Sequence, residues 1–271
     1  MRIRNYLLSS LILFGCGSSD NSSPLVPGSG AETGDITIPD SALPEQPAGP
    51  IEQFSRSNTA GFVVEEYQYY LSGSERIRHG HFHSYWDDGK RREEGAFAHG
   101  IKSQTWSYYD ETGEGLISAE VWKDGVIQQQ MTYYPDGTMR SETAFTEQGD
   151  VTSYFYANGK KEREGTYKNG FEVGVWTWYY ENGNIKEEGT FVDGKWDGVW
   201  AWYRENGTVE YHRIYANGIE RGVWSWWDEE GNKVRQEVWD NGQRVGHIEC
   251  VDYPEACRQV EKYRQFTGIH G

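Results

Sequence analysis

Three histidines offer the clearest possibility of metal chemistry in this sequence. His79, His81 and His83 alternate along one predicted strand, and alternation places all three side chains on one face of it. Imidazole nitrogens suit zinc, copper or nickel. The sequence repeats with a period of 24 residues, as described below. In an alignment of the repeats, His81 and His83 take the ordinary strand positions that Val175 and Thr177 take later. We keep a metal site here as the alternative interpretation and expect no cofactor.

Carboxylate pairs could support calcium binding or acid–base catalysis, but most of them lie beside predicted turns or at exposed strand positions. The sequence assigns no second, distant carboxylate to any of them, so a solvated face explains them better. The sequence also lacks a Gly-x-Ser-x-Gly elbow, a His-Glu-x-x-His motif and a phosphate-binding Gly-x-x-x-x-Gly-Lys loop. We therefore expect no enzyme. The pairs are Asp87–Asp88, Glu187–Glu188 and Glu229–Glu230.

Tryptophans recur at fixed strand positions, and all twelve lie between Trp86 and Trp239. Aromatic rows can stack on sugar rings, which would give a glycan-binding face. Rings at a fixed position in every repeat are first of all packing residues. Both roles are compatible if one face of the sheet is uncovered. The repeat aromatics and candidate binding face are Trp106, Trp176, Trp178, Trp200, Trp202, Trp224 and Trp226.

A repeat of 24 residues organises the chain, with rows that start at Gly174, Gly198 and Gly222. Each row holds two extended runs and two turns, and many turns read Asn-Gly or Asp-Gly, the strongest short-range signal of a hairpin. The pattern predicts an all-β array of stacked antiparallel hairpins. The turn glycines are Gly89, Gly113, Gly137, Gly159, Gly183, Gly207 and Gly231. One unit alone buries too little apolar surface to fold, so neighbouring units must stabilise each other.

The segment from Phe191 to Trp200 resembles a MORN repeat, with an aromatic-x-x-Gly-x-x-x-Gly-x-Trp core. The segment from Trp200 to Gly207 is similar to the variant in YwqK-type antitoxin proteins. The resemblance extends from His79 to Gly246 and implies an elongated, solenoid-like sheet used as a scaffold or binding platform. Its middle is degenerate. Gln104, Gln128 and Asp150 replace the leading glycine, and Gln130 and Thr152 replace the leading tryptophan.

The formal net charge is −16, from 42 acidic and 26 basic residues. Such a surface repels phosphate backbones, because binding them requires clustered Lys and Arg. We therefore expect no nucleic-acid partner. A basic protein partner is compatible with this charge.

The N-terminus has the features of an export signal. Arg2 and Arg4 precede a short apolar run, Tyr6 to Phe14, that is too short to span a bilayer. The following Gly15-Cys16 resembles the lipobox of bacterial lipoproteins, which implies lipid attachment at Cys16. Gly17 favours the outer membrane. We predict a signal peptide at 1–15, a Ser/Gly/Pro-rich tether at 16–60 and repeats at 61–246.

Residues 247–271 are predicted to cap the array. The run from Ala256 to Phe266 lacks Gly and Pro and indicates a short capping helix. Cys250 and Cys257 are predicted to form a disulfide, with two buried free thiols as the alternative.

Taken together, these features predict a non-catalytic lipoprotein of the bacterial envelope, facing the periplasm or the outside, that binds another envelope protein. One alternative is an antitoxin or immunity protein that sequesters a toxin. Another is binding of peptidoglycan or polysaccharide through the aromatic ladder.

Overall fold

The computed structural model describes residues 47 and 49–250 and contains only β-strands there. The strands are β1 (Glu52–Ser57), β2 (Val63–Ser72), β3 (Glu75–Tyr85), β4 (Arg91–Ala98), β5 (Ile101–Tyr109), β6 (Leu116–Lys123), β7 (Val126–Tyr133), β8 (Met139–Thr146), β9 (Gly149–Phe155), β10 (Lys161–Lys168), β11 (Phe171–Tyr179), β12 (Ile185–Val192), β13 (Lys195–Tyr203), β14 (Val209–Ala216), β15 (Ile219–Trp227), β16 (Lys233–Asp240) and β17 (Gln243–Glu249).

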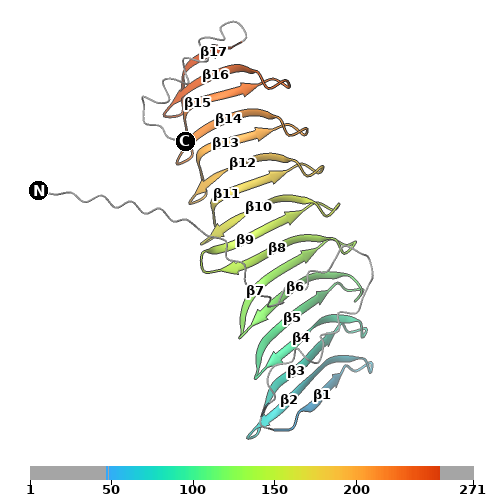
Figure 1. Ribbon diagram of the computed structural model, residues 1–271. Coiled ribbons are helices and arrows are strands. Elements are labelled where there is room, and N and C mark those ends of the chain that lie inside the picture. Colours follow the sequence, from blue (N-terminus) through green and yellow to red (C-terminus); the bar gives the residue numbers. More distant parts are fainter. Residues whose placement is uncertain (1–46, 48, 251–271) are drawn as a thin grey trace, which may run out of the picture. The chain divides into compact units, whose positions relative to one another are not determined.

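Every strand pairs antiparallel with the next strand along the chain, from β1 to β17. The result is one open sheet whose strands follow chain order (Figure 1). The predicted all-β array of hairpins is therefore confirmed. Open edges remain at β1 and β17 among the described residues.

The turns lie at two interleaved series of glycines. The first is the set of seven predicted turn glycines, and the second comprises Gly100, Gly125, Gly149, Gly170, Gly194, Gly218 and Gly242. All seven predicted turn glycines have positive φ, and each N–H donates to the carbonyl three residues earlier, as Gly183 does to Tyr180 at 2.8 Å. In the second series the residue before glycine also has positive φ in every turn except that at Gly149, for example Asn217 at 53° before Gly218 at 82°. Positive φ at both central residues defines the tight hairpin turn that suits the twist of a sheet.

A tryptophan on the first strand of a hairpin covers a glycine of the preceding strand. Trp200 lies over Gly189 so closely that a Cβ on the glycine would enter the indole ring. The indole N–H then donates to the carbonyl of Thr190 at 3.2 Å. Trp200 is 1% exposed, because Gly189 lies against its ring and Trp196 stacks on it with centroids 4.3 Å apart. The equivalent pairs are Gly95–Trp106 and Gly165–Trp176.

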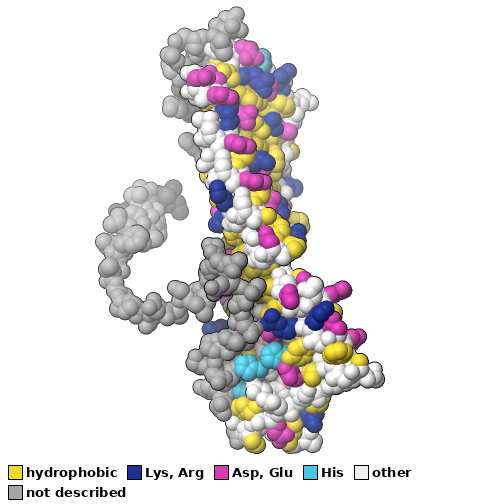
Figure 2. Space-filling view, turned by 90° about the vertical axis from the view of Figure 1, so that its right-hand side faces the viewer, with side chains coloured by type: hydrophobic (Ala, Val, Ile, Leu, Met, Phe, Trp, Pro, Cys, Tyr) yellow, Lys and Arg dark blue, Asp and Glu magenta, His cyan; other side chains and the backbone are white. Residues whose placement is uncertain are grey.

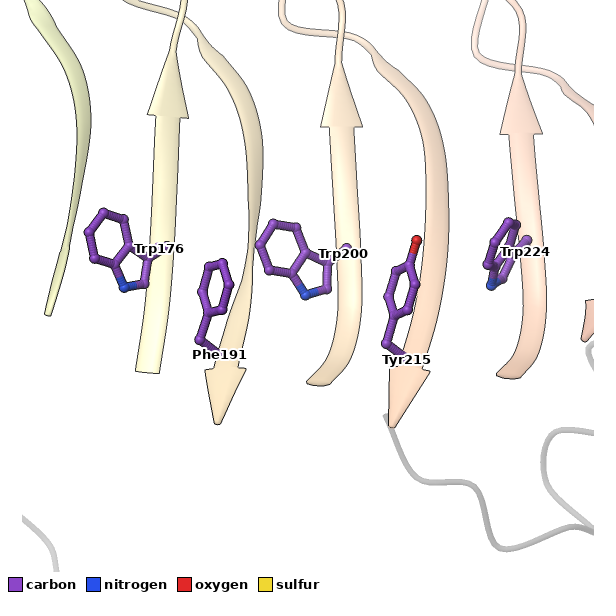
Figure 3. Packing of buried hydrophobic residues seen from close by; sticks show 5 residues of the cluster. All are labelled: Trp176, Phe191, Trp200, Tyr215 and Trp224. Carbon is purple, nitrogen blue, oxygen red and sulfur yellow. The ribbon is translucent and has the colours of Figure 1, made fainter. Parts of the chain in front are cut away.

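The buried rings form two separate clusters on one face of the sheet. The larger cluster joins one ring from each of β11 to β15, and Figure 3 shows them side by side. The smaller cluster lies on β3 to β5. Between the clusters, Gln130, Thr143 and Thr152 occupy the corresponding row, and the two threonine hydroxyls lie 3.1 Å apart. The degenerate middle therefore interrupts the aromatic core. The larger cluster comprises Trp176, Phe191, Trp200, Tyr215 and Trp224.

The leading glycines of the repeats provide bulges in the first strands. Gly198 has φ of 71°, and the pairing register shifts between Glu188 and Thr190 opposite it. Gln104 keeps the same backbone conformation at φ 62° despite its side chain. Gln128 and Asp150 do not have positive φ. The middle repeats therefore differ in backbone geometry as well as in packing.

The sheet begins earlier than predicted. β1 lies within residues 16–60, which the sequence assigned to the tether, and it pairs with β2. Phe54 provides the reason, because its ring stacks on Tyr67 with centroids 4.8 Å apart. At the other end, β17 crosses the predicted boundary at 246.

Several predictions concern parts of the chain outside the described residues. These are the signal peptide, lipid attachment at Cys16, the capping helix at 256–266 and the position of Cys257. Cys250 is described: it is 4% exposed and disulfide-bonded. Its pairing with Cys257 stays a prediction.

Gly189→Ala tests the contact between tryptophan and glycine. Gly189 has no positive φ, so the new methyl group acts only by displacing the Trp200 ring. We expect the free energy of unfolding to fall by about 3 kcal/mol, measured by chemical denaturation. Gly49→Ala is the control, because nothing lies within 4 Å of a Cβ there. Equal stability of the Gly189 variant and the parent protein would contradict this role.

Candidate binding surface

A second row of side chains crosses the same face of the sheet. On each strand it lies two residues away from the row that contains the buried tryptophans. Strand pairing joins Tyr154 to Arg163, Arg163 to Trp178 and so on across the hairpins. We call this set the aromatic row. It comprises Tyr154, Arg163, Trp178, Glu187, Trp202, Tyr211, Trp226 and Arg235. Every member is half-buried, so the row is partly open to solvent.

The rings of the aromatic row stack on one another. Trp202 and Tyr211 have centroids 4.7 Å apart and planes 20° apart. Tyr211 and Trp226 follow at 6.4 Å and 30°. The Arg235 guanidinium lies 3.9 Å from the centroid of Trp226. Ring faces are therefore largely occupied by neighbours within the row.

The two sets of tryptophans differ in the hydrogen bonds that their indole N–H groups donate. Trp176, Trp200 and Trp224 each donate to a backbone carbonyl at 3.2–3.3 Å. Within residues 49–250, those of Trp178, Trp202 and Trp226 donate no hydrogen bond. The buried set holds the sheet together, whereas the half-buried set retains donors for a ligand.

Charged side chains accompany the rings on this face. Arg213 takes the place of the covered glycine beside Trp224, with its guanidinium carbon 4.7 Å from the ring centroid. Arg163 lies 4.1 Å from the Tyr154 centroid. The Nε atoms of Arg163, Arg213 and Arg235 are buried without a hydrogen-bond partner. Figure 2 shows hydrophobic side chains among basic and acidic ones along the upper strands.

The opposite face is held together by tyrosine–glutamate pairs. Tyr203 donates to Glu188 at 2.6 Å, and Tyr179 donates to Glu164 at 2.5 Å. Burial and the hydrogen bond to Glu188 raise the pKa of Tyr203 to about 12, and the same causes act on Tyr179. Each of these two bonds connects a hairpin to the previous one.

The turns are also connected from unit to unit. The hydroxyl of Tyr156 donates to the carbonyl of Tyr179, and the hydroxyl of Tyr180 donates to that of Tyr203, both at 2.7 Å. Each link spans one repeat. The aromatic row is therefore held on a platform that is fixed at its face, its reverse and its turns.

The structure does not bring the three candidate histidines together. A bulge at Gly80, with φ of 97°, separates His79 from the other two. His79 is 2% exposed and packs 4.7 Å from the ring of His99, and burial lowers its pKa. His81 and His83 stack with centroids 6.4 Å apart. No group of three or more His, Cys, Asp or Glu in the described part of the chain could hold a metal ion.

The other candidate residues differ in the sheet face on which they lie and in how deeply they are buried. The structure brings Trp178, Trp202 and Trp226 into one row and buries Trp176, Trp200 and Trp224 beside them, while Trp106 belongs to the smaller cluster. The pair Glu187–Glu188 divides between the two faces. The sequence reasoning missed Tyr211, Arg163 and Arg235. Their signal was the cross-strand register, which the period alone does not give.

These features define an open repeat sheet with one partly exposed aromatic surface. The family model described as MORN repeat variant matches residues 151–169 and 172–193. This match supports the MORN-repeat family for that part of the chain and a repeat-based binding module. No curated protein matches the sequence. No helix in residues 49–250 is long and apolar enough to cross a membrane.

Three solved structures show weak similarity. A TarM mutant from S. aureus is 10% identical over 38% of this chain and 20% of its own, with a TM-score of 0.28. The TcdB2-TccC3-Cdc42 structure is 11% identical over 72% and 13%, with a TM-score of 0.22. The chain thus spans a small part of both. A porin-like protein from Bacteroides uniformis is 12% identical over 76% and 91%, with a TM-score of 0.16.

The tyrosine–glutamate pairs predict a loss of stability at high pH. Tyr203 has a pKa of about 12 in the folded protein against 10.0 ordinarily, so the unfolded chain ionises first. Stability present below pH 10 should fall as the pH rises to about 12. Denaturant unfolding across this range measures the fall. Tyr203→Phe should reduce the pH dependence, and an unchanged dependence would contradict the assignment.

Proposed function

We propose that this protein is a non-catalytic, lipid-anchored scaffold that binds another protein of the bacterial envelope through the aromatic row. The observation that carries the proposal is the continuous, half-exposed row of Trp, Tyr and Arg on a rigid open sheet. The match to the MORN repeat variant supports a repeat-based binding module. The export signal and Cys16 support a position at the outer membrane, facing the periplasm or the outside.

The composition of the row favours a protein partner. Trp, Tyr and Arg are enriched at the centres of protein interfaces, where a few such residues supply most of the binding energy. The stacked rings are already ordered before binding, so they lose little conformational entropy when a partner packs on them. The free indole N–H groups of Trp178, Trp202 and Trp226 suit carbonyl acceptors of that partner.

Ring orientation argues against the glycan alternative. Stacking on a sugar requires an open ring face, but Tyr211 stacks on Trp202, and Trp226 lies between Tyr211 and Arg235. Ring edges and hydrogen-bond donors remain for contact, and these suit an irregular protein surface. For the antitoxin alternative, the identity of the partner is decisive, because it requires a toxin in the same compartment.

Capture from crosslinked cells tests the proposal. We expect the full chain to retain one stoichiometric protein, and Trp202→Ala to lower its recovery about tenfold or more, as for a central interface residue. Val175→Ala is the matched control, since Val175 is 64% exposed and lies on the opposite face. Thermal unfolding of both variants verifies that they fold.

Three results would overturn this function: recovery of sugar fragments alone, no specific partner, or equal recovery with Trp202→Ala. A captured toxin would instead assign the protein to the antitoxin class while keeping the aromatic row as the contact surface.

A further inference from the structure

A hollow of about 520 Å³ opens on the aromatic face in the degenerate middle of the sheet. It lies across β7 to β10, at the end of the aromatic row. Its size falls within the range of small-molecule sites, roughly 300–1,000 Å³. The lining residues are Thr132, Tyr134, Arg140, Ser141, Tyr154, Glu162 and Arg163.

The hollow exists because one ring is missing. Thr132 takes the second aromatic position of its repeat, where Tyr108, Tyr154 and Trp178 stand in neighbouring repeats. Ser141 pairs with Thr132 across the strands, and neither side chain fills the space of an indole. Their hydroxyl oxygens lie 2.6 Å apart. One hydroxyl donates to the other, which leaves one O–H of the pair to donate to a ligand.

Two arginines face this hollow without a carboxylate partner. Neither Arg140 nor Arg163 forms an ion pair within residues 49–250. Arg163 stacks on Tyr154, and its Nε is buried without a hydrogen bond. Unpaired arginines at one site are unexpected in a chain with 42 acidic and 26 basic residues. The guanidinium fork matches the geometry of a carboxylate.

Glu162, which also lines the hollow, determines which ligand groups can lie beside that carboxylate. Glu162 forms no ion pair or hydrogen bond within the described residues and lies next to Arg163 along β10. An ionised carboxylate accepts hydrogen bonds only, so Glu162 suits hydroxyl or amino groups of a ligand. The hollow thus offers the guanidinium groups of Arg140 and Arg163 to a carboxylate, and the carboxylate of Glu162 to hydrogen-bond donors.

We propose that this hollow binds a small molecule whose carboxylate contacts Arg163 and Arg140 and whose adjacent hydroxyl or amino donors contact Glu162. Sugar acids and amino acids share this chemistry. The site goes beyond the proposed scaffold function, because it takes a small ligand and does not require the protein partner.

Isothermal titration of the full chain with galacturonate and with glutamate tests the site, and galactose is the control without a carboxylate. We expect one of the two acids to bind and galactose not to bind. Arg163→Gln should weaken binding about tenfold or more, because a charge-assisted hydrogen bond is lost. Thr132→Trp should abolish binding, because it restores the ring that the other repeats carry. Arg213→Gln is the matched control, since Arg213 stacks on Trp224 outside the hollow.

The titrations distinguish the two classes of ligand. Binding of galacturonate alone assigns a sugar acid, and binding of glutamate alone assigns an amino acid. The proposal is overturned if neither acid binds, if galactose binds equally well, or if Thr132→Trp leaves binding unchanged in a variant that melts no lower than the parent.

Discussion

The fold depends on a tryptophan that lies flat over a glycine of the neighbouring strand. A single-layer sheet has no second layer to exclude water from its aromatic face. Trp200 solves this by covering Gly189 and donating its indole N–H to the next carbonyl. Gly189 lies against the ring, Trp196 stacks on it with centroids 4.3 Å apart, and the ring is almost completely buried as a result. Because each contact joins two consecutive hairpins, the contacts add up along the chain, as in other repeat proteins.

This arrangement leaves the second aromatic position of each repeat available. Once Trp176, Trp200 and Trp224 cover the backbone, Trp178, Trp202 and Trp226 contribute less to burial and remain half-exposed. Tyr–Glu pairs stabilise the reverse face without burying large apolar side chains. One face therefore combines rigidity with accessible Trp, Tyr and Arg, which is the combination that a protein interface requires.

The degenerate middle shows what happens when the pattern is broken. Thr152 replaces the covering tryptophan and Thr143 replaces the covered glycine, so both partners of the contact are lost together. The strands still pair, because backbone hydrogen bonds do not require the rings. Polar side chains and a hollow replace the core at this point. The two aromatic clusters are thereby separated within a continuous sheet.

The sequence predicted much of the fold, because its period and its turn glycines report local backbone requirements. It did not predict β1, whose partner is recognisable only once Phe54 is seen against Tyr67. Nor did it place Glu187 in the aromatic row and Glu188 on the reverse face, because bulges change which side chains share a face. The hollow also depends on register, since it joins residues from four strands.

Site-specific photo-crosslinking in living cells tests the central claim most directly. A photoreactive phenylalanine derivative replaces Tyr211, within the aromatic row, in one variant. In a second variant the same derivative replaces Thr177, on the reverse face. The account predicts one crosslinked protein from position 211 and none from position 177. Crosslinks from position 177 alone, or no protein crosslink from position 211, would contradict it.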